Sequence, residues 1–306
     1  MKKFGNYQYV EGEDMTERDK QEVGSKFWNQ GKWDNFVLPF LPEDCKDLTF
    51  VDIGCNAGVF LELAKKKGFK KVIGVDADKE AIKRALKYRR RNKYKYDIWY
   101  RDMRNAINDL PPVDYLVMAN THYYFPIDDW LKFLEKLNEK VCNVIIVTAE
   151  KSPKYSKASA DLVDIRNYFK NWDERGFIDE LPLEGDPFPR RLWGLCFKNR
   201  DVERVSLDSL GSGNNVQNNF YPELDKGIDP LVTHYHKILA RYRRHSWPEH
   251  RLNRYMYGKA ELYKDVKKRG QMLPLIVNRT GRVLDGNHRY QMLKHLGYKN
   301  VIVIRT

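Results

Sequence analysis

Short apolar runs alternate with longer amphipathic stretches between residues 48 and 150. Runs of strand length and strand composition occupy Leu48–Ile53, Lys71–Val75, Asp97–Tyr100, Asp114–Met118 and Asn143–Val147. Between them the apolar residues recur at helical spacing, most clearly over 59–64, 79–91 and 130–134. This alternation predicts βαβ units and a parallel sheet of the Rossmann-like α/β class, with ligands bound at the carboxyl ends of the strands.

The pattern changes after residue 150. Residues Asp161–Trp172 favour a helix, and Phe177–Leu183 and Arg191–Phe197 favour two strands on either side of the proline-rich segment 184–190. We expect these strands to form an antiparallel hairpin that closes the sheet. The boundary falls near 199–203, so the first domain is predicted over 1–200 and the second over 201–306.

The sequence pattern of the second domain predicts an α+β fold that is smaller than the first domain. Strand patterns cover 201–207, 273–278, 282–284 and 301–304, and a helical pattern covers 287–296. A glycine- and asparagine-rich turn at 211–215 precedes a basic, aromatic, helical region over 231–269. We interpret about 218–260 as a basic helical insertion.

Composition limits the class of protein. Of the 306 residues, 42% are hydrophobic and 32% charged, which excludes a largely disordered chain. No apolar run reaches the roughly 18–20 residues that span a bilayer, and the basic start has no apolar stretch behind it. The four cysteines are far apart, so we expect no disulfide framework and no metal site. These features favour a soluble cytoplasmic protein without a membrane partner.

Positive charge is concentrated in the second domain. The net charge is +13, of which residues 201–306 carry +9. Residues 241–270 hold ten Lys and Arg against three acids, interleaved with Tyr242, Trp247, Tyr255, Tyr257 and Tyr263. Cations for phosphates and rings for stacking predict an RNA- or DNA-binding surface, although a merely solvated basic surface has the same composition. A second basic cluster covers 83–95.

Segments with acidic residues or glycines that could bind a ligand follow three successive predicted strands. The segment 51–58 (VDIGCNAG) lies between a strand and a helix, where glycines let the backbone approach a ligand. Asp76 ends the next strand, where a carboxylate can accept both hydroxyls of a ribose. Asp102 follows the third strand and suits an adenine amino group, with Met103 against the ring. Together the segments predict a nucleoside pocket.

This order resembles class I S-adenosylmethionine-dependent methyltransferases over about residues 25–200. Their first motif is D-x-G-x-G-x-G, and Asn56 stands here for the middle glycine. The resemblance implies S-adenosylmethionine as cofactor, with the methionine and ribose lined by Gly54, Asn56 and Gly58. Asp76 would then bind the ribose, and Asp102 and Met103 the adenine. The alternative, a dinucleotide site, is disfavoured because the spacing is not G-x-G-x-x-G and Asp52 would repel a pyrophosphate, whereas a sulfonium cation tolerates it.

Candidate catalytic residues follow the fourth strand, in the segment 119–125 (ANTHYYF). Methyltransferases acting on DNA-base amino groups carry N/D-P-P-Y/F here, and Asn120 and Tyr123 occupy the first and last positions without the prolines. His122 is a candidate general base, because an unperturbed imidazole titrates near ~6.5. The alternative is that His122 is simply packed.

The segment 283–289 (VLDGNHR), with the strand at 273–277 before it, resembles the ParB/sulfiredoxin-like superfamily over about 201–306. That superfamily has a D-G-x-x-R box at the start of a helix. Asn287 stands where sulfiredoxins carry cysteine, which argues against their chemistry. The resemblance implies phosphate or nucleotide binding by Gly286, Asn287, His288 and Arg289, and free N–H groups at a helix start with an arginine fork favour an anion. In the alternative, Arg289 pairs only with Asp285.

Three functions remain open. The first is a methyltransferase acting on a nucleic acid or nucleotide whose phosphate is held by the second domain. The second is a small-molecule methyltransferase with an appended nucleotide-binding domain. The third is a ParB-like DNA-binding protein whose first domain senses S-adenosylmethionine.

Overall fold

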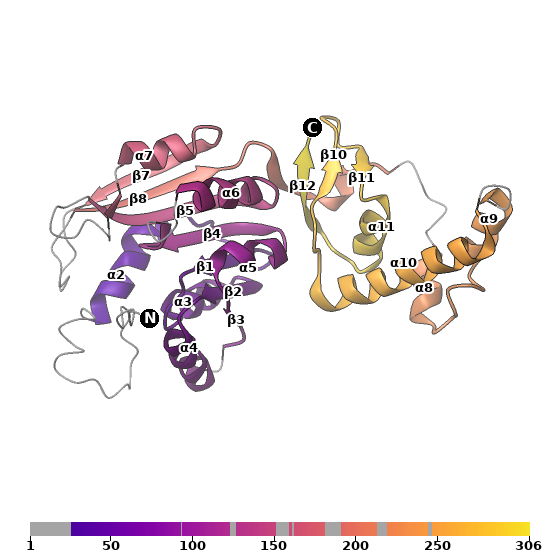
Figure 1. Cartoon of the computed structure of the whole chain (residues 1–306), viewed down its shortest axis with the longest axis horizontal. Helices are drawn as coiled ribbons and strands as arrows, with labels where there is room; N and C mark the ends of the chain where they lie inside the picture. Colours follow the sequence, from indigo (N-terminus) through magenta and orange to yellow (C-terminus); the bar gives the residue numbers. More distant parts are fainter. Residues whose placement is uncertain are drawn as a thin grey trace. The chain divides into compact units, whose positions relative to one another are not determined.

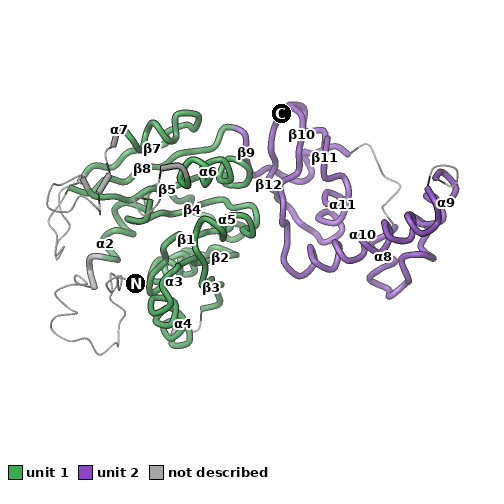
Figure 2. The backbone as a smooth tube through the Cα atoms, viewed as in Figure 1, with its two compact units in different colours: residues 1–200 green, residues 201–306 purple. Residues whose placement is uncertain are grey.

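The chain forms two compact units, residues 1–200 and 201–306 (Figure 2). The computed structural model describes residues 26–92, 94–122, 127–150, 159–160, 162–180, 191–212, 219–243 and 247–306. Each unit has its own sheet; the first has a buried apolar core on each face of its sheet, and the second has one core.

The first unit contains a mixed sheet whose main path runs in the order β3-β2-β1-β4-β5-β8-β7. Five strands of this main path are parallel, namely β1 (Thr49–Ile53), β2 (Lys71–Asp76), β3 (Asp97–Tyr100), β4 (Val113–Ala119) and β5 (Val141–Glu150). Strand β8 (Leu192–Lys198) runs antiparallel to β5 and to β7 (Asp173–Glu180), and the short β6 (Ser159–Ala160) pairs with β5. The predicted parallel sheet with a closing antiparallel hairpin is therefore confirmed (Figure 1).

Helices cover both faces of this sheet, and the strand residues alternate between two cores. One face packs against α2 (Lys26–Phe36), α3 (Val59–Lys67) and α4 (Lys79–Asn92), and the short 3-10 helix η1 (Leu38–Phe40) follows α2. The other face packs against α5 (Met103–Asp109), α6 (Ile127–Asn138) and α7 (Leu162–Tyr168). In β1, Phe50 faces the first core and Val51 the second, and both are fully buried. Apolar residues on both sides of a strand are typical of a parallel sheet covered by helices.

Two local predictions differ from the structure. Helix α7 ends at Tyr168, earlier than predicted, and β7 begins at Asp173, earlier than the predicted Phe177. Tertiary contacts at Trp172 explain the early end, because its ring packs on Phe169 and its Nε1–H donates to Asn138 Oδ1 at 2.6 Å. The predicted strand end at 181–183 and the proline-rich segment lie outside the described residues.

The second unit is an α+β unit with a four-stranded mixed sheet in the order β11-β10-β12-β9. Its strands are β9 (Val202–Ser206), β10 (Leu275–Val277), β11 (Val283–Asp285) and β12 (Asn300–Arg305). Helix α11 (Asn287–His295) connects β11 to β12, and the 3-10 helix η4 (Leu207–Ser209) follows β9. The parallel pair β10–β12 lies between two antiparallel pairs.

The predicted basic insertion at about 218–260 is helical and forms part of the core of this unit. It contains α8 (Phe220–Asp225), α9 (His234–Arg243) and the first part of α10 (Glu249–Arg269). Phe220, Tyr221, Tyr235 and Met256 are buried in the same core as the sheet. Because α10 continues unbroken to Arg269, the insertion has no structural border at 260.

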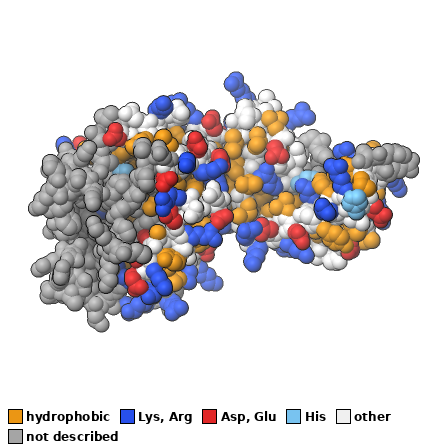
Figure 3. All heavy atoms as spheres, in the orientation of Figure 1, with side chains coloured by type: hydrophobic (Ala, Val, Ile, Leu, Met, Phe, Trp, Pro, Cys, Tyr) orange, Lys and Arg blue, Asp and Glu red, His pale blue; other side chains and the backbone are white. Residues whose placement is uncertain are grey.

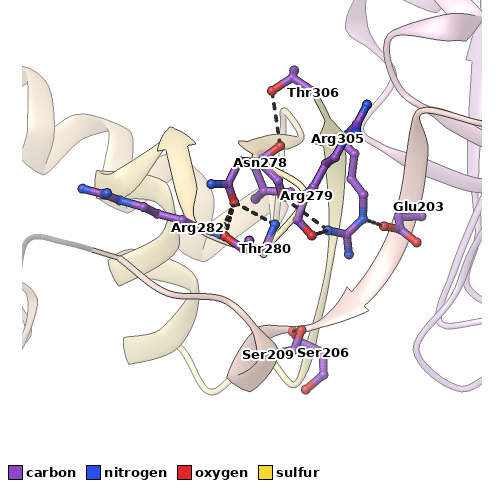
Figure 4. A network of polar contacts seen from close by, with 10 residues as sticks. Glu203, Ser206, Ser209, Asn278, Arg279, Thr280, Arg282, Arg305 and Thr306 are labelled. Carbon is purple, nitrogen blue, oxygen red and sulfur yellow. Dashed lines mark hydrogen bonds and ion pairs between the residues drawn. The ribbon is translucent and has the colours of Figure 1, made fainter.

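One polar network joins the β10–β11 turn to the edge of the sheet (Figure 4). The Asn278 side-chain oxygen accepts hydrogen bonds from the Thr280 and Arg282 backbone N–H groups at 3.1 and 2.9 Å. Arg305 of β12 pairs with Glu203 of β9 and donates to the Asn278 and Arg279 carbonyls. These contacts close the turn against the last strand.

All four cysteines are buried and free. Burial raises the pKa of the Cys196 thiol to about 12, so this side chain is an unreactive core residue. In the parts of the chain that the structure describes, no helix is long and apolar enough to cross a membrane.

Candidate functional site

The loops at the carboxyl ends of β1 and β2 are hydrogen-bonded to each other. After β1 the chain turns through Gly54, whose N–H donates to the Val75 carbonyl at 2.8 Å, and Cys55, whose N–H donates to the same carbonyl at 3.1 Å. The Asn56 N–H then donates to Asp76 Oδ2 at 2.8 Å. The two segments that the sequence singled out separately are thus one connected structure.

Thr121, in the loop after β4, packs against the loop after β1. Its Oγ1–H donates to the Ile53 carbonyl at 3.2 Å. A Cβ on Gly54 would lie 2.0 Å from Thr121 Cγ2, and Gly54 has a φ of +76°, so this position requires glycine. Sequence reasoning missed Thr121 as a site residue, because nothing in its local pattern reveals that it packs on Gly54.

Two buried oxygens at this edge have no hydrogen-bond partner within the described residues. One is Asp52 Oδ2 and the other is Asn120 Oδ1. Asn120 also adopts a left-handed backbone with a φ of 56°. Burial, helped by the negative charge of Asp76, raises the pKa of Asp52 to about 8. Buried polar atoms without partners are rare in folded proteins, and a bound ligand is one explanation for such an atom.

The carboxylate of Asp76 is held by two backbone N–H groups. Its Oδ2 accepts the Asn56 N–H and its Oδ1 accepts the Asp78 N–H, both at 2.8 Å. A carboxylate has about four lone-pair sites, so acceptor capacity remains on both oxygens. Desolvation by burial raises the pKa of this carboxyl above its ordinary value. Gly54, Asn56 and Gly58 of the neighbouring loop all have positive φ angles, and the binding of ribose and methionine by these residues stays a prediction.

Asp102 and Met103 lie after β3, where Arg101 N–H donates to the Asp76 carbonyl at 3.0 Å. Asp102 caps α5, and Arg104 engages both of its oxygens, at 2.9 Å through Nε and 2.5 Å through Nη2. This arginine holds the pKa of Asp102 below its usual range. Met103 packs against the core formed by α5, α6 and α7. Asp102 is therefore ionised, and its carboxylate accepts hydrogen bonds from the Arg104 side chain.

His122 is buried, and desolvation lowers its pKa to about 4. Its imidazole is neutral at pH 7 and is a weaker base than an exposed histidine. Tyr123 lies outside the described residues. Of the three candidate catalytic residues, the structure therefore places Asn120 and His122 directly after β4.

The residues 285–289 of the second unit form a box at the start of α11. Gly286 has a φ of +89°, and a Cβ there would lie 2.8 Å from Leu275 Cδ2. Arg289 donates to the Pro274 carbonyl at 3.0 Å and pairs with Asp285 at 3.3 Å. Arg289 therefore pairs with Asp285, as the alternative predicts, but it also bonds the Pro274 carbonyl.

The other two box residues are also held by neighbours. His288 lies between two tyrosine hydroxyls, with Tyr255 at 2.6 Å from Nε2 and Tyr221 at 3.4 Å from Nδ1. Burial, together with Lys259, lowers its pKa to about 3. Asn287 Oδ1 accepts from Ser212 Oγ at 2.7 Å. The box is thus brought together as predicted, while its role in binding stays a prediction.

Comparisons with known proteins identify the first unit. A model of the methyltransferase domain family matches residues 27–206, which is more than half of the chain. The ribosomal protein L11 methyltransferase of Colwellia psychrerythraea (strain 34H / ATCC BAA-681) is 45% identical over 49 residues, which cover 16% of this chain and 17% of that protein.

Two solved structures illustrate the likeness in fold. The N-methyltransferase NodS from Bradyrhizobium japonicum WM9, in complex with S-adenosyl-L-homocysteine, has a TM-score of 0.41 at 16% identity, covering 50% of this chain and 79% of that one. Magnesium protoporphyrin IX methyltransferase (ChlM) from Synechocystis PCC 6803, with bound SAM, has a TM-score of 0.46 at 16% identity, covering 60% and 86%. The chain belongs to the methyltransferase domain family, whose model matches residues 27–206.

Proposed function

We propose that this chain transfers the methyl group of S-adenosylmethionine to a nucleic acid or nucleotide, with the phosphate of that substrate bound by the second unit. The observation that carries the proposal is the carboxyl edge of the first sheet. There the loop 54–58 is hydrogen-bonded to the carboxylate of Asp76, and Asp52 and Asn120, on β1 and directly after β4, each have a buried side-chain oxygen without a partner among the described residues.

The cofactor supplies an electrophilic methyl group on a sulfonium centre. In this proposal Gly54, Asn56 and Gly58 line its methionine and ribose portions, and Asp76 accepts hydrogen bonds from the ribose hydroxyls. Asp102 and Met103 contact the adenine, using lone pairs of Asp102 that Arg104 leaves available. The buried Asp52 favours a cation, because a positive charge beside it stabilises its ionised form.

On the substrate side, the residues after β4 orient the group that receives the methyl. Methyl transfer depends mainly on in-line positioning, and a base is needed only where the nucleophile carries a proton. The buried Asn120 oxygen accepts a hydrogen bond from a substrate N–H or O–H group. The neutral His122 or the hydroxyl of Tyr123 then receives or relays the proton.

Replacing Asp76 by alanine should lower the affinity for S-adenosylmethionine by about tenfold or more, because the lost hydrogen bonds are worth roughly 1–3 kcal/mol. Isothermal titration calorimetry measures the change, and Asp44→Ala, at an exposed carboxylate elsewhere in the unit, is the matched control. Equal affinities of Asp76→Ala and wild type would remove Asp76 from the cofactor site.

The second unit contributes cations and rings for a polyanion. The guanidinium groups of Arg243 and Arg251 lie over the Trp247 ring at 5.3 and 4.9 Å, and Tyr242 is 82% exposed. We propose that the 241–270 region and the 285–289 box of a ParB-like domain bind nucleic-acid phosphate through these groups. Affinity should then fall as the salt concentration rises, since bound phosphates release their counterions.

Replacing Arg289 by alanine tests the box. If Arg289 holds a phosphate, the variant loses the thermal stabilisation that nucleotides or polyanions give the wild type, while S-adenosylmethionine still binds the first unit. If Arg289 only ties Asp285 and Pro274 together, the variant melts at a lower temperature and nucleotides shift neither protein. Thermal melting of both proteins with and without nucleotide distinguishes these results.

Transfer of labelled methyl from the cofactor into total RNA, total DNA and small-molecule extracts tests the function itself. Label in a nucleic acid or nucleotide supports the proposal. Label in another small molecule supports the small-molecule methyltransferase with an appended nucleotide-binding domain. No label in any fraction, with intact cofactor binding, supports the DNA-binding protein that senses S-adenosylmethionine.

A further inference from the structure

The first unit contains a basic cavity at the opposite end of the sheet from the cofactor loop. It has a volume of about 320 Å³ and lies where β2 and β3 begin, whereas the cofactor loop lies where they end. The residues that line it are Lys70, Lys71, Val72, Arg89, Tyr94, Lys95, Tyr96 and Asp97. The proposed function uses none of them.

Strand register explains why there is a cavity here. The ladder between β2 and β3 begins at the pair Ile73–Asp97, so Lys71 and Val72 extend beyond the start of β3. The segment 94–96 instead approaches α4, where Arg89 Nη1 donates to the Tyr96 carbonyl at 2.8 Å. The cavity is the space between the extended start of β2 and this segment.

Hydrogen bonds also fix the side of the cavity that is formed by the turn into β2. Lys65 Nζ donates to the Phe69 and Lys70 carbonyls at 2.7 and 3.0 Å, which fixes the turn that leads into β2. Phe69 and Tyr96 are both buried in the core beneath. Because both walls are anchored, the cavity does not need a ligand in order to form.

Positive charge dominates the two segments that line the cavity. The described residues in 65–71 and 89–97 include nine Lys and Arg and a single acid, Asp97. The last turns of α3 and α4 supply six of the cations, Lys65, Lys66, Lys67, Arg89, Arg90 and Arg91. In the space-filling view, Lys and Arg side chains gather at the lower end of the first unit, where α4 lies (Figure 3).

Cations at the end of a helix are ordinary, because they complement the helix dipole. Here, however, cations come together from four elements, namely two helix ends, the start of β2 and the entry to β3. A half-buried tyrosine ring, Tyr94, lies among them. The charge extends beyond the cavity over both helix ends, which fits a chain of phosphates better than one small anion. Rings beside cations are the combination that binds single-stranded nucleic acid.

We propose that this cavity binds the phosphodiester backbone of a single-stranded nucleic acid, with a base or sugar against Tyr94. The proposal rests on the proposed function, since it makes the methyltransferase unit itself a contact surface for a nucleic-acid substrate. In this arrangement Lys70, Lys71, Arg89 and Lys95 neutralise phosphates at the amino end of the sheet. The methyl donor is bound at the other end.

A charge-matched pair of double variants of the full chain tests the proposal. One is Lys71→Gln with Lys95→Gln at the cavity, and the other is Lys132→Gln with Lys170→Gln, at exposed lysines of the same unit. Fluorescence anisotropy with a labelled single-stranded RNA, and with DNA of the same sequence, gives the affinities over a range of salt concentrations.

We expect the cavity variant to bind at least one of these strands about tenfold more weakly. Its plot of log affinity against log salt should be less steep by roughly 1.4, because each lost phosphate contact changes the slope by ~0.7 on single strands. The control variant should stay near the wild type. Ultraviolet crosslinking of the bound strand should modify the peptide that contains Tyr94.

Three results would overturn the proposal. They are an unchanged affinity of the cavity variant, an equal loss in both variants, and a crosslink that never reaches Tyr94. If poly-glutamate competes as well as RNA at equal charge, an acidic protein is the better partner. S-adenosylmethionine binding and methyl transfer are measured on the same variants. The failure of the proposed methyltransferase function and the failure of the proposed nucleic-acid binding at the cavity therefore give different results.

Discussion

Replacing Asp52 by asparagine should stabilise the protein progressively more as the pH rises from 5 to 9. Asp52 is buried, and burial with the nearby Asp76 raises its pKa to about 8 in the folded state. In the unfolded chain the same carboxyl titrates near ~3.9. Between these two values the folded state binds more protons than the unfolded state, so the stability of the wild type decreases with rising pH.

Each unit of pKa shift corresponds to about 1.4 kcal/mol, so the carboxylate costs several kcal/mol of stability once the pH passes about 8. Asparagine does not titrate and escapes this cost. Urea unfolding of both proteins at pH 5, 7 and 9 measures the difference in the free energy of unfolding. A difference that is the same at all three pH values would show that Asp52 is ionised in the fold even at low pH.

The same variant bears on the cofactor. A cation bound beside Asp52 favours its ionised form, so S-adenosylmethionine should release a proton from the wild type at pH 7 and none from Asp52→Asn. Calorimetry in buffers with different ionisation enthalpies counts that proton. Binding without proton release would separate Asp52 from the cofactor site and leave its effect on stability intact.

Replacing Gly54 by alanine should reduce S-adenosylmethionine affinity by more than a hundredfold and lower the melting temperature. The new Cβ would lie 2.0 Å from Thr121 Cγ2, and alanine is also strained at a φ of +76°. Either Thr121 or the loop must move, and the loop carries the Asn56 contact with Asp76. Calorimetry with the cofactor and thermal melting measure the two effects.

Two further variants separate the clash from the backbone strain. Gly68→Ala places a methyl group at a φ of +104° with nothing within 4 Å, so it should cost only the left-handed strain of roughly 1–2 kcal/mol. Thr121→Ser removes the clashing methyl while keeping the hydroxyl that bonds the Ile53 carbonyl. Combined with Gly54→Ala it should restore part of the cofactor affinity, and no recovery would mean that the collision with Thr121 is not the cause.

The order of elements in the first sheet was predictable because its strands are buried on both faces. A run such as Leu48–Ile53 is apolar throughout, and β1 begins within one residue of the predicted start. Helix α5, by contrast, has a short and mostly polar sequence and was not predicted. The side chain of Asp102 accepts the Arg104 N–H and thereby starts that helix.

The candidate cofactor residues were found from sequence because parallel strands bring their carboxyl ends to one edge. Asp52, Gly54 and Asp76 could therefore be grouped without coordinates. What those side chains contact could not be predicted in this way. Thr121 meets Gly54 across 67 positions of the chain, and such a packing contact leaves no mark in local pattern.

The sequence by itself determined the alternation of strands and helices, the basic second unit and the acids and glycines at three strand ends. Local periodicity and strand direction are sufficient for these. Only the tertiary structure decided that Asp52 is buried without a partner for one oxygen, that Arg104 occupies Asp102, and that His288 lies between two tyrosines. Burial depends on packing between residues far apart in the chain, and the pairing even of near neighbours depends on side-chain geometry that local pattern does not record; together they set each group's pKa and its capacity to bind.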